Sequence, residues 1–178
     1  MKIYTKTGDD GNTGLQGNLR ISKSHPRIIS YGTVDEANAA LGVVLTNSLD
    51  DDINKILTEI QNDLFLVGAD LSNPNLNDMK NRMPLDKIEK LEQHIDHFES
   101  ELPPLTNFIL PGGDIAAAQL HYVRTVVRRA ETLVVQLSEK DEINANCIKY
   151  LNRLSDLFFV IGRLINKRKN NSDIPWKP

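Results

Sequence analysis

The sequence predicts an all-α protein, a bundle of five helices that follows an extended N-terminal arm. Two observations lead to this fold class. Beyond about residue 25, apolar residues recur at spacings of three and four, the period of a helix with one buried face. Short segments rich in proline, glycine or asparagine divide this region into five stretches, and short connections favour antiparallel neighbours in a bundle.

The bounds of the five helices follow from the breaks between them. Pro103-Pro104 ends one helix, and Asn73-Pro74-Asn75 ends another. Asp114 comes directly after Pro111-Gly112-Gly113 and is expected to cap the helix that follows. We expect helices over residues 26 to about 46, about 51–71, from 85 to before 103, after 114 to about 137, and about 142–169.

The two ends of the chain differ from this pattern. Residues 1–24 are rich in Gly, Thr, Asp, Asn and Ser, so we expect an ordered arm with a short strand at residues 2–5. The tail, residues 170–178, is expected to be loose, and docking of Trp176 is left open. Together with the bundle at 25–169, these parts form one predicted domain over residues 1–178.

Composition limits the setting and the partners. A chain of 178 residues can bury about 70% of its unfolded surface without a disulfide or metal. The single Cys147 cannot form an internal disulfide, which favours a reducing compartment. No secretory signal and no apolar run of about 20 residues is present, so a cytoplasmic location is expected. A net charge of -3 argues against nucleic-acid or membrane binding, and a bound anion would need a few placed cations.

The arm carries the first candidate motif, TKTGDDGNTG at residues 5–14. Its glycines let backbone N–H groups approach phosphate oxygens, while threonine hydroxyls and a lysine add donors. The spacing is neither that of a P-loop nor that of an EF-hand. A pair of tight turns without a binding role is the alternative interpretation.

The fourth helix carries a cationic face. His121, Arg124 and Arg128 are spaced three and four apart, and the two arginines lie about 6 Å apart along the axis. This separation suits two guanidinium groups that grip neighbouring phosphates. A solvated charged face is the alternative, although the opposite face of the helix is strongly apolar.

Polar side chains also follow one face of two other helices. One stripe is Asn152, Asp156, Phe159 and Arg163, and the other is Tyr31, Asp35, Asn38 and Gly42. Buried charges need partners, and the simplest partners for Asp35 and Asp156 are the arginines. The alternative is a salt-bridge network that only fixes the register of the helices.

Two further features are less specific. The segment Phe108–Gly113 is apolar and precedes a helix, so it either presents an aromatic ring to a large flat ligand or covers the end of the core. Metal chemistry is poorly supported, because the four histidines are scattered and Cys147 has no Cys-x-x-Cys partner. His94 and His97 lack the Glu-x-x-His spacing of di-iron bundles and are expected to be solvated.

Taken together, these segments resemble the PduO-type ATP:cob(I)alamin adenosyltransferases. Six motifs carry the resemblance, and they occur in the family's order over nearly the whole chain. They are TKTGDDGNTGL at 5–15, RISK at 20–23, YGTVDEANA at 31–39, FILPGG at 108–113, LHYVRTVVRRAE at 120–131 and NRLSDLFF at 152–159.

The resemblance implies a five-helix bundle, ferritin-like or cobalamin-adenosyltransferase-like, that forms a homotrimer with active sites between subunits. The ligands it implies are ATP, Mg²⁺ and cobalamin or another corrinoid. A cobalamin reductase and an adenosylcobalamin-dependent acceptor enzyme are candidate partners. The arm residues that would hold the ATP triphosphate are Thr5, Lys6, Thr7, Gly8, Gly11, Thr13 and Gly14.

The resemblance also implies roles for single residues outside these arm positions. Arg128 would bind the polyphosphate, and Arg124 would pair with Asp35 of the partner subunit. Glu131 and Asn152 would contact the nucleotide, Lys23 would hold the arm closed, and Phe108 would occupy the lower axial side of the corrin. No protein metal site is implied with certainty, because Mg²⁺ would be held mainly by the phosphates, with Glu131 as a candidate ligand.

The reaction implied is transfer of the 5′-deoxyadenosyl group of ATP to the cobalt of cob(I)alamin, which yields adenosylcobalamin and tripolyphosphate. A carrier that delivers adenosylcobalamin with little catalysis is one alternative. A helical-bundle NTPase is another, and release of ADP or phosphate would distinguish it.

Overall fold

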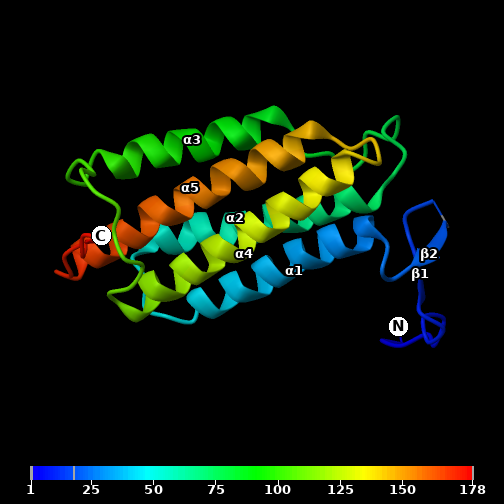
Figure 1. The fold of residues 1–178 in the computed structure, drawn as a ribbon, viewed down its shortest axis with the longest axis horizontal. Helices are drawn as coiled ribbons and strands as arrows, with labels where there is room; N and C mark the ends of the chain where they lie inside the picture. Colours follow the sequence, from blue (N-terminus) through cyan, green and yellow to red (C-terminus); the bar gives the residue numbers. More distant parts are fainter. Residues whose placement is uncertain (1, 18, 178) are drawn as a thin grey trace.

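The computed structural model describes residues 2–17 and 19–177, so Met1, Asn18 and Pro178 lie outside the described part. It confirms the predicted bundle of five helices, which run roughly along one long axis (Figure 1). A two-stranded sheet lies outside the bundle. The elements are β1 Asn12–Gly14, β2 Arg20–Ser22, α1 Pro26–Val44, α2 Asp51–Ser72, α3 Leu85–Glu99, α4 Ile115–Ser138 and α5 Ala145–Arg168.

Side-chain caps set several helix starts. The predicted cap at Asp114 is present, since its carboxylate accepts a hydrogen bond from the backbone N–H of Ala116 at 2.9 Å. The side chain of Asn144 caps α5 in the same way, through the N–H of Asn146 at 3.0 Å. Because this cap lies at residue 144, α5 begins three residues later than the predicted start at about residue 142.

One continuous apolar core holds the helices together. The main helix pairs are α4 with α5, α1 with α4, α1 with α2, and α3 with α5. Helix α5 is the most enclosed, and almost every side chain from Leu157 to Asn166 is buried. The predicted apolar face of α4 is confirmed as part of this core, including Val123, Val127 and Val134. The opposite face of α4 is therefore free to carry polar groups.

The N-terminal arm forms a β-hairpin that projects from the end of the bundle where α1 begins (Figure 1). Residues 2–5 are not a strand, so that prediction was wrong. The strands instead pair Thr13 with Ile21, and Gly17 takes a positive φ of 83° in the connecting turn. Leu15 is buried, and the Gln16 amide donates to the Ala69 carbonyl at 3.1 Å, so the base of the hairpin is tied to the end of α2.

The described part of the C-terminal tail is bonded to the bundle, so the loose tail is not observed and the alternative that was left open, docking of Trp176, is. The N–H of Leu110 donates to the Ile174 carbonyl at 2.8 Å, and the N–H of Trp176 donates to the Phe108 carbonyl at 2.7 Å. The Trp176 ring meets the Phe108 ring edge-on, with centroids 6.5 Å apart. The tail thus braces the loop that precedes α4. None of the described helices combines the length and the apolar character needed to cross a membrane.

Candidate functional site

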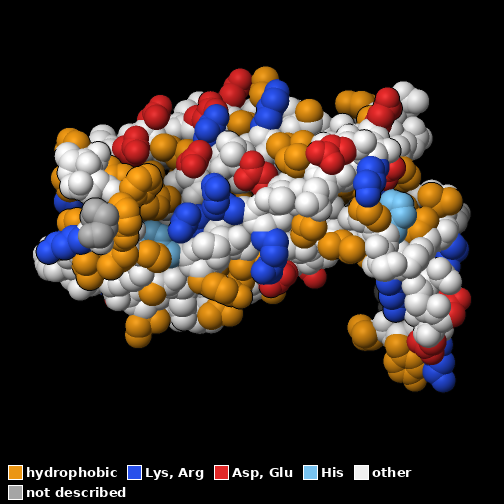
Figure 2. Space-filling view, viewed as in Figure 1, with side chains coloured by type: hydrophobic (Ala, Val, Ile, Leu, Met, Phe, Trp, Pro, Cys, Tyr) orange, Lys and Arg blue, Asp and Glu red, His pale blue; other side chains and the backbone are white. Residues whose placement is uncertain are grey.

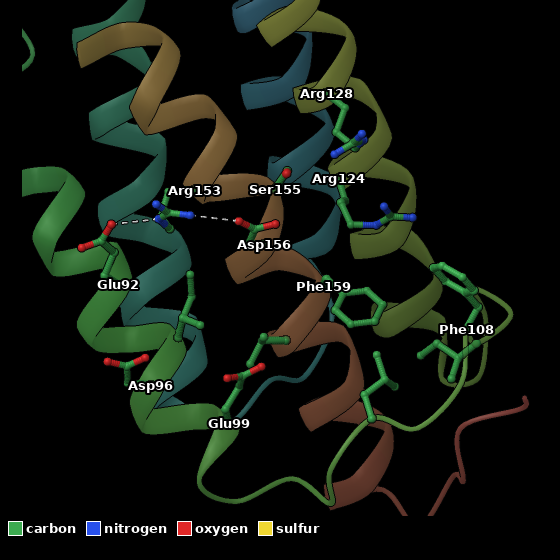
Figure 3. A pocket seen from close by; sticks show the side chains of 14 residues that line it. Glu92, Asp96, Glu99, Phe108, Arg124, Arg128, Arg153, Ser155, Asp156 and Phe159 are labelled. Atoms are coloured by element: carbon green, nitrogen blue, oxygen red, sulfur yellow. Dashed lines mark hydrogen bonds and ion pairs between the residues drawn. The ribbon is translucent and has the colours of Figure 1, made fainter. Parts of the chain in front are cut away.

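A groove of about 790 Å³ runs between α3 and α4, with α5 as its floor (Figure 3). The loop before α4 closes one end of the groove. Its apolar lining is Ile95, Leu105, Phe108, Ile109, Phe159 and Val160. Its polar lining is Glu92, Asp96, Glu99, Arg124, Arg128, Arg153, Ser155 and Asp156. The groove therefore combines a broad apolar surface with charges of both signs, the composition expected of a site for a large ligand.

Two arginines of α4 face this groove, as the helical spacing predicted (Figure 3). The Arg124 guanidinium carbon lies 6.0 Å from the centre of the Phe159 ring, and its Nε is buried without a hydrogen-bond partner among the described residues. Burial, together with the nearby charge of Arg128, lowers the pKa of Arg124. Arg128 is exposed in the groove, so its guanidinium group can receive an anionic ligand, whereas Arg124 is half-buried.

His121 lies beneath the groove rather than on its cationic wall. Its side chain is only 3% exposed, and neither ring nitrogen has a partner in the described chain. The ring centre lies 6.0 Å from that of Phe159, and a Cβ at Gly162 would come within 3.1 Å of the imidazole. Burial is the main cause that lowers the pKa of His121, and the charge of Arg124 adds to it. The imidazole thus packs against Phe159 beneath the groove.

The polar stripe of α5 divides among three environments. Phe159 forms the floor of the groove, whereas Asn152 donates a hydrogen bond to Glu131 on α4 at 2.9 Å. Asp156 pairs with Arg153 of its own helix at 3.3 Å, so the prediction of an α4 arginine as its partner was wrong. Arg163 is buried and pairs with Asp173 of the tail at 2.8 Å, away from the groove.

The polar stripe of α1 does not reach the groove within one chain. Asp35 is exposed and has no arginine partner in the part of the chain described here, whereas its neighbour Glu36 pairs with Arg129 at 2.5 Å. Asn38 is buried and donates to the Gln61 carbonyl of α2 at 3.2 Å. Asn38 thus contributes to the packing of α1 on α2, whereas Asp35 lies on the surface, where it can contact another molecule.

Phe108 lies at the rim of the groove and is 80% exposed. It lines a surface hollow together with the partly exposed Leu105 and Trp176, and a contiguous exposed apolar patch of this kind often marks a binding surface. Because the loop that carries Phe108 is bonded to the tail at both Leu110 and Trp176, the position of this ring is set by the fold.

The arm backbone turns sharply at two positions. Lys6 and Gly11 both take positive φ angles, 62° and 82°, and the hydroxyls of Thr5 and Thr7 lie 2.8 Å apart. The Lys23 ammonium would approach a Cβ at Gly8 to 3.1 Å, so a glycine at this position gives the lysine room. Thr13 and Gly14 belong to β1, where Thr13 is half-buried and Gly14 is exposed.

The arm and the groove are far apart within one chain. None of the described arm residues lines the groove, and the arm projects away from the bundle (Figure 2). The structure therefore brings together Arg124, Arg128 and Phe108, with Glu131 and Asn152 paired nearby on α4 and α5. It does not bring Asp35 or the arm to these residues in the same chain.

Residues 3–165 match the sequence profile of a family described as "Cobalamin adenosyltransferase". The chain belongs to the cobalamin adenosyltransferase family. A "Cobalamin adenosyltransferase" of Cupriavidus metallidurans is 42% identical, covering 99% of this chain and 94% of the relative. A "Corrinoid adenosyltransferase" of Bacillus subtilis is 41% identical, covering 99% of this chain and 93% of the relative.

Solved structures in the family agree with the fold. A phenylalanine-to-alanine variant of the PduO-type ATP:corrinoid adenosyltransferase from Lactobacillus reuteri, complexed with cobalamin and ATP, matches with a TM-score of 0.95 and 36% identity over 99% of this chain and all of the other. An arginine-to-lysine variant of the same enzyme, complexed with ATP, matches with a TM-score of 0.92 over 98% of this chain. These matches confirm the resemblance and the helical-bundle fold that the motifs indicated.

Sequence reasoning missed one wall of the groove. It treated α3 only as a helix that contributes to the core, yet Glu92, Asp96 and Glu99 line the groove (Figure 3). Their spacing of four and three places all three carboxylates on one face of α3, and this spacing was the signal that could have revealed them.

The histidines of α3 differ from each other. His97 is exposed as predicted, but His94 is half-buried, its Nε2 has no partner in the described chain, and burial lowers its pKa. The prediction that His94 is solvated was therefore wrong. Within residues 2–17 and 19–177 there is no group of three or more His, Cys, Asp or Glu side chains placed to hold a metal ion.

Proposed function

We propose that the chain transfers the 5′-deoxyadenosyl group of ATP to the cobalt of cob(I)alamin or a related corrinoid. The observation that carries this proposal is the groove, in which Arg124 and Arg128 lie beside an apolar surface that ends at Phe108. This combination suits a ligand pair with a polyphosphate and a large ring. Full-length relatives named as corrinoid adenosyltransferases support the same reaction.

The reaction is a nucleophilic displacement at carbon. The electron pair of Co(I) forms a bond to C5′ of the ATP ribose, the C5′–oxygen bond breaks, and its electron pair leaves with tripolyphosphate. Because cobalt is the nucleophile, the protein needs no activated serine or cysteine and no general base. Its tasks are to align the two substrates and to stabilise the charge on the leaving group.

The nucleotide side of this site would be built from α4 and the arm. Arg128 is exposed in the groove and would bind the polyphosphate, while Lys6 and the hydroxyls of Thr5 and Thr7 would hold it from the other side. The positive φ angles at Lys6 and Gly11 turn the arm backbone so that it can follow a phosphate chain. Lys23, close to Gly8, would keep this loop closed.

The residues near Arg128 also fit a Mg²⁺ ion that is held mainly by phosphates. Glu131 uses one carboxylate oxygen to accept from Asn152, which leaves the other oxygen for a ligand. Mg²⁺ is commonly held by one or two carboxylates together with substrate phosphates, so a single carboxylate suits this arrangement. Bound Mg²⁺ would neutralise part of the triphosphate charge, and Asn152 would orient Glu131 while it contacts the nucleotide.

The corrin side would be formed by the aromatic residues. Phe108 would occupy the lower axial face of the cobalt, which excludes an axial ligand and makes Co(II) easier to reduce. Phe108 and Arg128 are twenty positions apart, as are the phenylalanine and the arginine varied in the Lactobacillus reuteri structures. This equal separation supports equivalent positions for the two pairs.

We infer that a second copy of the chain completes the site, as in a homotrimer. Asp35 is exposed, the Arg124 Nε is buried without a partner in the described chain, and the arm projects beyond its own groove. Pairing of Arg124 with Asp35 of the partner subunit would satisfy both groups and bring a second arm close. Light scattering should give a mass three times the 20.0 kDa of the chain, and a monomer at working concentration would contradict the inference.

The proposed reaction is tested by its products. The protein is incubated without oxygen with chemically reduced cobalamin and Mg-ATP, and both the corrin spectrum and the released phosphates are followed. We expect a cobalt–carbon bond and one tripolyphosphate for each adenosylcobalamin formed. Release of ADP or phosphate in place of tripolyphosphate would indicate attack at phosphorus and refute the proposal.

A further inference from the structure

The two walls of the groove carry opposite charge. Arg124 and Arg128 project from α4, while Asp96 and Glu99 line the opposite side on α3 (Figure 3). Neither Asp96 nor Glu99 forms an ion pair with a described residue. Between the walls, Phe159 and Val160 form the apolar part of the α5 floor, and the carboxylate of Asp156 on that floor is paired with Arg153. The groove carboxylates that form no ion pair with a described residue, Asp96 and Glu99, therefore lie along one edge.

The lysines and the groove-lining carboxylates of α3 lie on different faces of the helix. Its lysines face α2, where Lys87 pairs with Asp63 at 2.8 Å and Lys90 pairs with Glu59 at 2.6 Å. These cations therefore do not neutralise the groove face. Among the described residues, the carboxylates of Asp96 and Glu99 have no ion-pair partner, and they lie beside an apolar surface where they are available to a ligand.

Arg153 does not neutralise the acidic wall either. Its guanidinium group pairs with Glu92 at 2.9 Å and with Asp156 at 3.3 Å. Glu92 lies more than one helical turn before Glu99 on α3. Arg124, on the opposite wall, does not pair with Asp96 or Glu99 either, and its Nε has no partner in the described chain. The two acidic side chains therefore keep their charge facing the groove.

The edge of a mature corrin ring carries acetamide and propionamide side chains, whereas less processed corrinoids carry carboxylates at the same positions. A carboxylate on the protein accepts hydrogen bonds from amide NH₂ groups but repels another carboxylate. We infer that Asp96 and Glu99 contact the edge of the corrin ring and make the site selective for amidated over carboxylated corrinoids. This inference rests on the proposed function and names its substrate class.

The test measures binding of two Co(II) corrinoids, which do not accept the adenosyl group unless they are reduced further. Cob(II)inamide carries the amides, and cob(II)yrinic acid carries carboxylates in their place. Each is measured by anaerobic equilibrium dialysis in the presence of Mg-ATP, with the wild type, with the double variant Asp96→Asn, Glu99→Gln, and with Glu89→Gln. Glu89 also lies on α3 but does not line the groove, so it controls for the loss of charge alone.

We expect the wild type to bind cob(II)inamide at least about tenfold more tightly than the carboxylate ring. The double variant should reduce this ratio by about tenfold, and Glu89→Gln should keep the ratio. Attraction of the carboxylate ring by the α4 arginines is the same in every variant, so it cancels when the ratio of a variant is compared with the ratio of the wild type. An unchanged ratio in variants that still bind ATP would overturn the inference.

Failure of this inference can be distinguished from failure of the proposed function. Wild-type protein that forms adenosylcobalamin from cob(I)alamin but shows no effect of Asp96 and Glu99 on the ratio would refute only the role of the α3 wall. Wild-type protein that binds ATP yet forms no adenosylcobalamin would refute the proposed function itself.

Discussion

Replacing Arg128 with alanine separates the chemistry of the site from the stability of the fold. The side chain is exposed, lies in the groove and forms no ion pair with the described chain. Its removal therefore leaves no buried group unsatisfied. The free energy of unfolding should change by no more than about 0.5 kcal/mol, as for other surface substitutions.

The expected effect on catalysis is much larger. A preorganised donor that stabilises charge in the transition state contributes about 10²–10³ in rate, or about 2.7–4 kcal/mol of activation free energy. Arg128 would act on the departing tripolyphosphate, whose charge grows as the C5′–oxygen bond breaks. Arg128→Ala should therefore lower kcat by at least about a hundredfold.

The assay is the anaerobic formation of adenosylcobalamin from cob(I)alamin and Mg-ATP, with thermal unfolding measured in parallel. Arg129→Ala is the matched control, since it removes the same side chain one position along the helix. Arg129 pairs with Glu36 on the surface and does not line the groove. A nearly wild-type rate in Arg128→Ala, or an equal loss in both variants, would refute the reasoning.

Three further predictions concern other parts of the molecule. Phe108→Ala should lower the rate of adenosylation by about tenfold or more while the Kd for ATP, measured by calorimetry, changes by less than about twofold, because the ring would act on the cobalt alone. Gly113→Ala should lower the free energy of unfolding in urea by at least about 2 kcal/mol, because Gly113 has a φ of 99° and a Cβ there would overlap the buried Asn166 amide. The free energy of unfolding should fall as the pH drops below about 6.5, the ordinary pKa of histidine. Burial lowers the pKa of His94 and of His121 in the folded state, so below this pH the unfolded chain binds more protons than the folded chain.

Each of these predictions has a control. Equal losses of adenosylation and ATP affinity in Phe108→Ala would contradict its role at the cobalt. Gly17→Ala shares a positive φ of 83° but meets no atom within 4 Å, so it should cost less than Gly113→Ala. The exposed His97 provides the control for pH: His97→Gln should keep the dependence, and the double replacement of His94 and His121 by glutamine should flatten it.

The helices could be predicted from sequence because their signals are local. The apolar periodicity predicted α1 and α2. Asp114 and the glycines before it predicted the start of α4. The arm was harder to predict. Residues 2–5 have strand-forming side chains but pair with no described strand, whereas β1 and β2 pair across the turn that contains Gly17. The tail also depends on a distant partner, because Trp176 is bonded to the loop at Phe108.

The site was predicted in part for the same reason. The face shared by Arg124 and Arg128 follows from helical spacing, and both residues line the groove. Burial of His121 could not be read from that spacing, because it depends on the room beside Gly162 in another helix. The acidic wall of α3 depends on how three helices pack together, and the division of the chain into one domain stays a prediction.

Subunit complementation tests most directly the claim that an arm and the arginines of a different chain form one site. Lys6→Ala would disable the arm, Arg128→Ala would disable the groove, and each variant alone should be nearly inactive. Co-expressed in equal amounts, they should recover about a quarter of wild-type activity, since half of the arms and half of the grooves remain intact and combine at random in a closed ring. Activity no greater than that of the separate variants would contradict a site shared between chains.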